Sequence, residues 1–148
     1  RSLEKNINFK EIKVVLDCAN GATYYVAPMI FWELGCDVIP IGNQPNGRNI
    51  NAQCGAVNVE QLSKKVLETN SDIGFAFDGD GDRLGVVDNR GKIVWADQYM
   101  LILCSEITKL YDQPKIIMDV KCSKVFFDEA KKVELKKINL MYLQRPLD

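Results

Sequence analysis

Three aspartates stand at alternate positions in one short stretch of the chain, FAFDGDGDR over residues 75–83. Only glycine separates Asp78, Asp80 and Asp82, and Arg83 follows directly. Side chains at alternate positions of an extended backbone point to the same side, and glycine lets such a backbone curl until the carboxylates converge. Three like charges this close repel one another unless a cation gathers them. The stretch therefore predicts a site for one divalent cation.

The ligand type and the arginine narrow the chemistry of this site. Carboxylate oxygens are hard ligands that favour Mg²⁺, Ca²⁺ or Mn²⁺ over softer metals. Arg83 adds a planar donor next to the three acids, and such a donor suits the oxygens of a phosphate ester. Three carboxylates leave coordination positions of the metal open, and a phosphoryl oxygen can fill one of them. We therefore expect a metal that helps to hold a phosphate group.

Other interpretations of the acidic stretch are a solvated hairpin turn, a noncatalytic Ca²⁺-binding module and a stand-alone phosphatase. An EF-hand calcium loop requires glycine at its sixth position and glutamate at its twelfth. Counting from Asp78, these positions hold Arg83 and Asn89, so an EF-hand is excluded. The other three interpretations stay open as alternatives.

The elements around the stretch predict an α/β fold. We expect a mixed, mostly parallel four-stranded sheet covered by helices. The aspartates would then follow a strand at the carboxyl edge of the sheet, where ligands commonly bind in such folds. Apolar runs predict the strands, and apolar residues at helical spacing predict the helices. The predicted strands are 13–17, 37–41, 73–77 and 84–88, and the predicted helices are 22–34, 59–68 and 96–109. Asn58 and Asp97 are the expected N-caps of the second and third helices, and Trp32 on the first helix is expected to lie in the core.

A second, incomplete α/β unit follows a linker near Pro114. Residues 115–120 predict a strand and residues 123–132 a helix start, whereas residues 133–148 show no clear pattern. One strand and one helix cannot bury their own apolar faces. We therefore expect residues 1–110 to form the metal-binding domain and residues 111–148 to be part of a further domain.

The composition limits the classes of function. The 148 residues are 47% apolar and 26% charged, as in a globular protein, and the net charge of -1 provides no field to attract nucleic acid or an anionic membrane. Without a long apolar run or a signal-peptide core, we expect a cytoplasmic protein. Five cysteines without a C-x-x-C pair predict reduced, buried thiols. The absence of histidine excludes Ser-His-Asp triads and His-ligated zinc from this chain.

The stretch DGDGDR resembles the metal-binding loop of the α-D-phosphohexomutases. VVLDCANGA at residues 14–22 and ELGCDVIPI at residues 33–41 are similar to the second domain of that family. PNGRNINAQCGA at residues 45–56 resembles the phosphoglucosamine mutase branch. KIIMDVKCSK at residues 115–124 is more like the opening of the third domain in the phosphomannomutase/phosphoglucomutase branch.

This resemblance implies an enzyme of four domains that moves a phosphoryl group between the 6- and 1-positions of a hexose phosphate, through a phosphoserine and a bisphosphorylated intermediate. Asp78, Asp80 and Asp82 would bind Mg²⁺, and Arg83 would contact the substrate phosphate. Glucosamine phosphate is the favoured substrate, and a phosphomannomutase/phosphoglucomutase is the alternative within the family.

The phosphoserine segment of that family, T-A-S-H-N-P, has no counterpart in this sequence, and neither has its sugar-recognition loop. We therefore expect no catalytic residue within this chain, and we expect the chain alone to be inactive. The expected partners are a hexose phosphate and the remaining domains of the same enzyme, with neither nucleic acid nor membrane among them.

Overall fold

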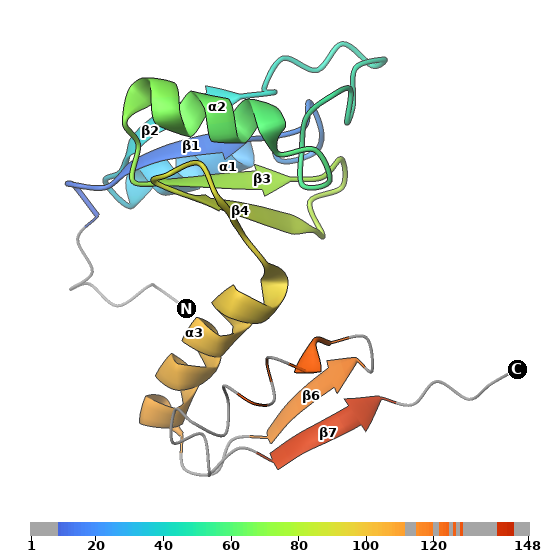
Figure 1. Cartoon of the computed structure of the whole chain (residues 1–148). Coiled ribbons are helices and arrows are strands. Elements are labelled where there is room, and N and C mark those ends of the chain that lie inside the picture. The colour runs from blue at the N-terminus through green and yellow to red at the C-terminus, as the bar shows by residue number, and fades with distance from the viewer. Residues whose placement is uncertain are drawn as a thin grey trace, which may run out of the picture. The chain divides into compact units, whose positions relative to one another are not determined.

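The structure, a computed structural model, describes residues 9–111, 115–119, 122–124, 126, 128 and 139–143. Its contacts divide the chain into two units, Arg1–Val94 and Trp95–Asp148. The first unit contains a five-stranded sheet and the second a two-stranded sheet (Figure 1). The domain border that the sequence predicts at residue 110 stays a prediction.

The sheet of the first unit is mixed, which confirms the predicted α/β class. Strand β1 is central, and it pairs in parallel with β2 on one side and with β3 on the other. Strand β4 pairs antiparallel with β3, and the short β5 pairs antiparallel with β4 and adds a fifth strand to the four predicted ones. In the order β2-β1-β3-β4-β5, the strands are Asp37–Ile41, Lys13–Asp17, Ile73–Phe77, Leu84–Asp88 and Ile93–Val94.

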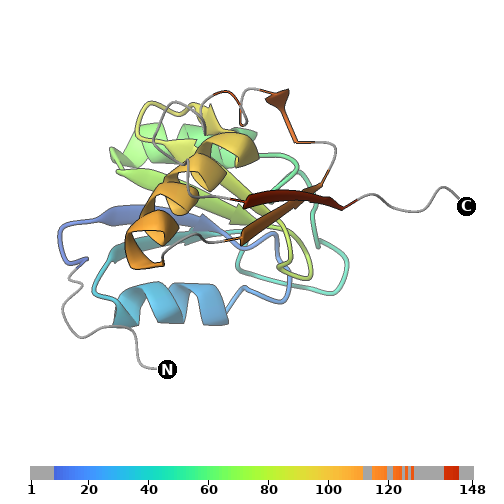
Figure 2. The same cartoon turned by 90° about the horizontal axis from the view of Figure 1, so that it is seen from below.

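One helix covers each face of this sheet, as Figure 2 shows. Successive residues of a strand point to opposite faces. Accordingly, Val15 packs in the cluster of helix α2, Glu60–Thr69, while Val14 and Leu16 pack in the cluster of helix α1, Val26–Glu33. The hydrophobic core therefore consists of two layers with β1 between them.

The two layers differ in coverage. Helix α2 packs mainly on β1, β3 and β4, whereas the eight-residue α1 packs mainly on β2. The α1 layer consequently contains an apolar hollow of about 300 Å³, and Phe9, Phe31 and Phe75 are among its lining residues. The prediction that Trp32 belongs to the core was wrong, because this side chain on α1 is 55% exposed.

Both helices start later than predicted. Residues 22–25 form a turn, and α1 begins at Val26, so that Pro28 lies in the first helical turn, where its missing N–H would have no helical partner. The predicted capping residue of α2, Asn58, is one position early, because Val59 is the N-cap and its side chain makes no capping bond. Asn70 ends α2 in the left-handed conformation.

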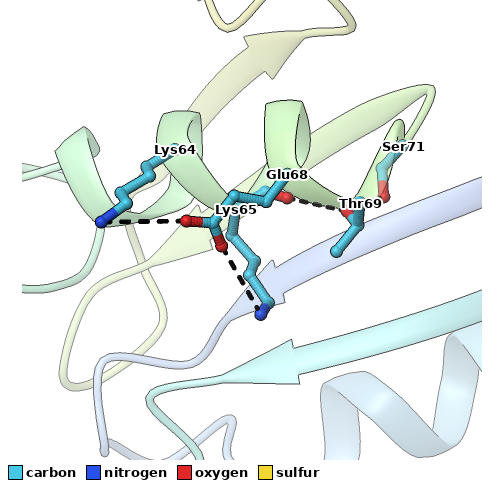
Figure 3. A network of polar contacts seen from close by, with 5 residues as sticks. All are labelled: Lys64, Lys65, Glu68, Thr69 and Ser71. Atoms are coloured by element: carbon cyan, nitrogen blue, oxygen red, sulfur yellow. Dashed lines mark hydrogen bonds and ion pairs between the residues drawn. The ribbon is translucent and has the colours of Figure 1, made fainter.

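A small polar network lies along the last turns of α2 and the residues that follow it (Figure 3). The carboxylate of Glu68 pairs with the ammonium groups of Lys64 and Lys65, both at 3.8 Å. The hydroxyl of Thr69 donates to the carbonyl of Lys65 and lies 2.7 Å from the hydroxyl of Ser71. Such exposed ion pairs contribute little, so the stability of α2 comes chiefly from its buried apolar face.

The second unit begins with helix α3, Ala96–Leu110, whose extent agrees with the predicted helix to within one residue. The side chain of Gln98 accepts the N–H of Trp95 and closes its start, whereas the predicted cap, Asp97, accepts the N–H of Ser123. The buried side chains of Cys104 and Phe126 form its small core.

A parallel pair of strands completes the described part of this unit. Strand β6, Lys115–Asp119, agrees with the prediction, and β7, Asn139–Leu143, pairs with it although its segment shows no clear sequence pattern. Most of the helix start predicted at 123–132 lies outside the described residues.

The five cysteines are free thiols, and four of them are buried, as predicted. Burial and the nearby charge of Asp17 raise the pKa of the Cys18 thiol to about 11. Within the described ranges, none of the helices combines the length and the apolar character needed to cross a membrane.

Candidate metal and phosphate site

The three predicted acids lie together in the loop that joins β3 to β4. One carboxylate oxygen from each of Asp78, Asp80 and Asp82 lies within 4.8 Å of the other two. Because β3 is parallel to β1, this loop lies at the carboxyl edge of the parallel strands. The predicted convergence of the carboxylates is therefore present in the fold.

Asp78 shapes the loop through its own side chain. Its Oδ1 accepts the backbone N–H groups of Gly81 and Arg83, both at 3.1 Å. Gly81 has a φ of +81°, which a side chain would disfavour. Asp78 is 7% exposed, whereas Asp80 and Asp82 are exposed. One carboxylate thus folds the loop, while the other two face solvent.

The loop holds three carboxylates and only one cationic side chain, that of Arg83. Burial acts to raise the pKa of Asp78, but hydrogen bonds from the Arg83 N–H, Asp82 and the Gly81 N–H, together with the charge of Arg83, lower it below its usual value. Repulsion from Asp80 and Asp78 raises the pKa of Asp82, and the charge of Arg83 offsets this only in part. A bound dication would relieve this repulsion, so the donor set fits a hard metal ion such as Mg²⁺.

Arg83 stands beside the acids with most of its side chain in solvent. Its Nε lies 3.4 Å from Oδ2 of Asp78 and 4.0 Å from Oδ1 of Asp82, and the side chain is 68% exposed. An open pocket of about 420 Å³ adjoins the cluster, and its lining includes Asp80, Arg83 and the apolar Val57. The guanidinium is therefore oriented by the acids and accessible to an anion.

Two other segments of the chain hold the loop through backbone hydrogen bonds. The N–H of Ala22 donates to the carbonyl of Gly79 at 2.8 Å, and the N–H of Ala56 donates to the carbonyl of Phe77 at 3.0 Å. A Cβ on Gly21 would collide with the carbonyl oxygen of Gly79. We call residues 18–22 the first support segment and residues 50–56 the second; together they fix the peptides on either side of Asp78.

The support segments have an unusual backbone. Ala19, Asn20, Asn51 and Gln53 have φ between +49° and +56°, a region that side chains rarely occupy. Such conformations cost free energy and persist only where neighbouring contacts impose them. The side chain of Asn20 contributes by accepting the N–H of Gln44 at 3.0 Å.

Asp17 supports this site from behind, a role that was not predicted from the sequence. Its carboxylate is fully buried at the end of β1, and its oxygens accept the N–H groups of Ala19 at 2.9 Å and Gly55 at 2.7 Å. Burial raises its pKa, and the two hydrogen bonds act in the opposite direction. The available signal was an acidic residue directly after the apolar run Val14, Val15 and Leu16 of β1.

Comparisons with known proteins agree with this architecture. The family model "Phosphoglucomutase/phosphomannomutase, alpha/beta/alpha domain II" matches residues 2–91. Phosphoglucosamine mutase of Agrobacterium fabrum is 50% identical over 103 residues, which are 70% of this chain and 23% of that protein. The same enzyme of Helicobacter pylori strain Shi470 is 54% identical over 102 residues, 69% of this chain and 23% of that protein.

A solved structure is similar over most of the chain. The phosphoglucomutase/phosphomannomutase family protein of Burkholderia thailandensis aligns with a TM-score of 0.77 at 32% identity, covering 95% of this chain and 31% of that one. The chain thus spans about a quarter of the length of the two mutases above, 23% in each case.

Proposed function

Because the chain belongs to the phosphoglucomutase/phosphomannomutase family, we propose that it is part of a phosphosugar mutase, an isomerase that moves a phosphoryl group between the 6- and 1-positions of a hexose phosphate. The proposed route uses a phosphoserine and a bisphosphorylated intermediate, and the remaining domains of the same enzyme supply the phosphoserine. Glucosamine phosphate is the favoured substrate, since the relatives at 50% and 54% identity are phosphoglucosamine mutases.

The contribution of this chain is to bind Mg²⁺ through Asp78, Asp80 and Asp82. The convergence of their oxygens within 4.8 Å is the observation that carries this proposal. Two N–H bonds fix Asp78, while Asp80 and Asp82 are exposed to solvent, from which an ion can reach them. When bound, Mg²⁺ would offset negative charge on the phosphoryl oxygens during transfer.

Arg83 binds and orients the phosphate beside the acids. Its Nε faces Asp78 and Asp82, which leaves the outer edge of the guanidinium free for two parallel hydrogen bonds to phosphate oxygens. A lysine would bring a point charge without this fixed geometry. This role supports substrate binding and the stabilisation of developing charge, whereas the phosphoryl transfer itself takes place on groups outside this chain.

A phosphomannomutase/phosphoglucomutase is the second candidate. It is favoured by the likeness of residues 115–124 to that branch and by the 32% identity to the Burkholderia thailandensis protein. The cytoplasmic location that we expect from the sequence also stays a prediction.

Titration and a chimeric enzyme test the proposal. The chain should bind Mg²⁺ in calorimetry without a large preference for Ca²⁺. In a chimera, the chain replaces its matching segment of Agrobacterium fabrum phosphoglucosamine mutase, and Asp80→Asn should lower its kcat by at least about 100-fold, a loss of about 2.7 kcal/mol. The control variant Asp72→Asn should remain active.

Three results would contradict this function. A strong preference for Ca²⁺ would favour the noncatalytic module, and phosphate release by the chain alone would favour a phosphatase. An active Asp80→Asn chimera would remove the metal site from the mechanism. Relative rates of the parent chimera on glucosamine, mannose and glucose phosphates distinguish the two substrate candidates.

A further inference from the structure

Asp17 is a buried carboxylate that takes no part in the proposed metal or phosphate binding. It is 0% exposed, and a buried charge is costly unless hydrogen bonds satisfy it. Each oxygen accepts one backbone N–H, Oδ1 from Ala19 at 2.9 Å and Oδ2 from Gly55 at 2.7 Å. The second donor is 38 positions away in the sequence, so the carboxylate joins two separate parts of the chain.

The two donors belong to the segments that hold the aspartate loop. Ala19 lies in the first support segment, which ends with the bond from Ala22 to the carbonyl of Gly79. Gly55 lies in the second, immediately before Ala56, which donates to the carbonyl of Phe77. These two carbonyls flank Asp78 on either side. Each half of the Asp17 carboxylate is therefore linked to one side of the metal loop.

The backbone encloses this carboxylate closely. A Cβ on Gly42 would lie 2.5 Å from Oδ1 of Asp17, so the backbone closes directly over the oxygen. The N–H of Asn51 donates to the carbonyl of Ala19 at 2.9 Å and joins the two support segments a second time. Ala19 has a φ of +51°, which costs free energy for a residue with a side chain, so contacts such as its bond to Asp17 must hold it in place.

We propose that Asp17 is a positioning residue that holds loop 78–83 in the conformation in which its three carboxylates converge. It acts through the N–H groups of Ala19 and Gly55 and touches neither the ion nor the substrate. The inference rests on the proposed function only in taking the converged loop as the metal site. It predicts that loss of the Asp17 charge loosens the loop while the sheet stays folded.

Asp72 offers a matched control for this inference. It is also an aspartate that accepts a backbone N–H, from Lys13 at 2.8 Å, but it is exposed and lies at the opposite, amino end of β1 and β3. Asp17→Asn keeps the shape of the side chain but turns one acceptor oxygen into a donor that faces an N–H group. Asp72→Asn makes the same chemical change at the other end of the sheet.

The experiment measures amide hydrogen exchange and Mn²⁺ affinity for both variants of the full chain, well below their melting temperatures. In Asp17→Asn, we expect the amides of Ala22 and Ala56 to exchange at least tenfold faster and the Kd for Mn²⁺ to rise at least tenfold. In Asp72→Asn, both quantities should change by less than twofold. A purely structural role of Asp17 would lower the melting temperature without this local pattern.

Gly55→Ala distinguishes the position of the second support segment from the charge of Asp17. It leaves every charge in place, but its Cβ would lie 2.8 Å from the carbonyl oxygen of Phe77, so it should weaken Mn²⁺ binding as Asp17→Asn does. It also replaces Asp17→Asn if that variant does not fold.

Protected Ala22 and Ala56 amides in Asp17→Asn would overturn the inference, as would a loss of Mn²⁺ affinity in Asp17→Asn but not in Gly55→Ala. If the unmodified chain bound no Mn²⁺, the proposed metal site would fail, while the exchange of the two amides would still decide the role of Asp17.

Discussion

Two hairpin turns of the sheet are shaped in the same way, by an aspartate that accepts backbone N–H groups and by a glycine with positive φ. In the β3–β4 loop, Asp78 accepts two backbone N–H groups, and Gly81 has a φ of +81°. In the β4–β5 turn, Asp88 accepts two backbone N–H groups at 2.9 and 2.8 Å, and Gly91 has a φ of +72°. An aspartate that folds a turn is therefore no sign of a metal site in itself.

The difference lies in what surrounds each turn. The β3–β4 loop carries two further acids, Asp80 and Asp82, and is held by the two support segments, whereas the β4–β5 turn is tied to helix α2 by the bond from Ser63 to the carbonyl of Gly91. The solvated-turn interpretation describes the β4–β5 turn well. In the β3–β4 loop the three carboxylates converge, which favours the metal site that we propose over a solvated turn.

The largest expected effect tests the gathered acids themselves. Asp80→Asn removes one charged ligand and should raise the Kd for Mg²⁺ by about 100-fold. In metal-free buffer its melting temperature should stay the same or rise, since repulsion within the loop falls. Calorimetry and thermal unfolding check both parts. A collapse of the melting temperature without metal would show that Asp80 serves the fold instead.

The next effect tests the support behind the loop. Gly21→Ala places a Cβ against the carbonyl of Gly79, and backbone cannot yield as a side chain can, so it should cost about 2–3 kcal/mol and weaken Mg²⁺ binding. Gly91→Ala meets mainly the side chains of Leu67 and Ser63 and should cost about 1 kcal/mol with Mg²⁺ binding unchanged. Denaturant unfolding and calorimetry measure both. Equal effects on Mg²⁺ binding would erase the distinction between the two turns.

A third effect depends on pH and concerns Cys18, at the start of the first support segment. Its pKa rises from the usual 9.0 to about 11 on folding, so the folded state favours the protonated thiol. The contribution of Cys18 to the free energy of unfolding is fully present below pH 9 and is lost as the pH rises toward 11. Between these values, the unmodified chain should lose about 2 kcal/mol more than Cys18→Ala. Denaturant unfolding at both pH values measures this, and parallel losses in the two proteins would refute it.

The smallest effect is that of the control turn. Asp88→Asn removes an acceptor that serves two N–H groups in a partly exposed turn, and it should cost about 1 kcal/mol. Its affinity for Mg²⁺ should equal that of the unmodified chain. A weaker Mg²⁺ affinity in this variant would mean that the two turns are coupled through β4.

The elements with strong local signals were predictable from the sequence. Ile73–Phe77 and Leu84–Asp88 form strands with the predicted ends, because apolar runs and turn residues mark them locally. Trp32 was assigned to the core wrongly, since helical spacing does not tell how much of the sheet a short helix covers. Strand β7 was missed because its partner, β6, lies 24 positions earlier in the chain.

The residues of the candidate site also differ in how far the sequence alone predicts them. Asp78, Asp80, Asp82 and Arg83 lie within six residues, so spacing alone brought them together. The contribution of Asp17 depends on a bond to Gly55 that only the folded chain creates. The residues proposed to face the ligand were therefore predictable from their spacing, whereas the residue that supports them was not.

The apolar hollow beside α1 has a consequence for compression. Where the apolar walls of this hollow exclude water, its volume is lost on unfolding, so the unfolded chain would occupy less volume than the folded one. High hydrostatic pressure should therefore act first on the layer of Phe31 and Phe75, while the α2 layer, in which Leu62 and Val66 are fully buried, yields later.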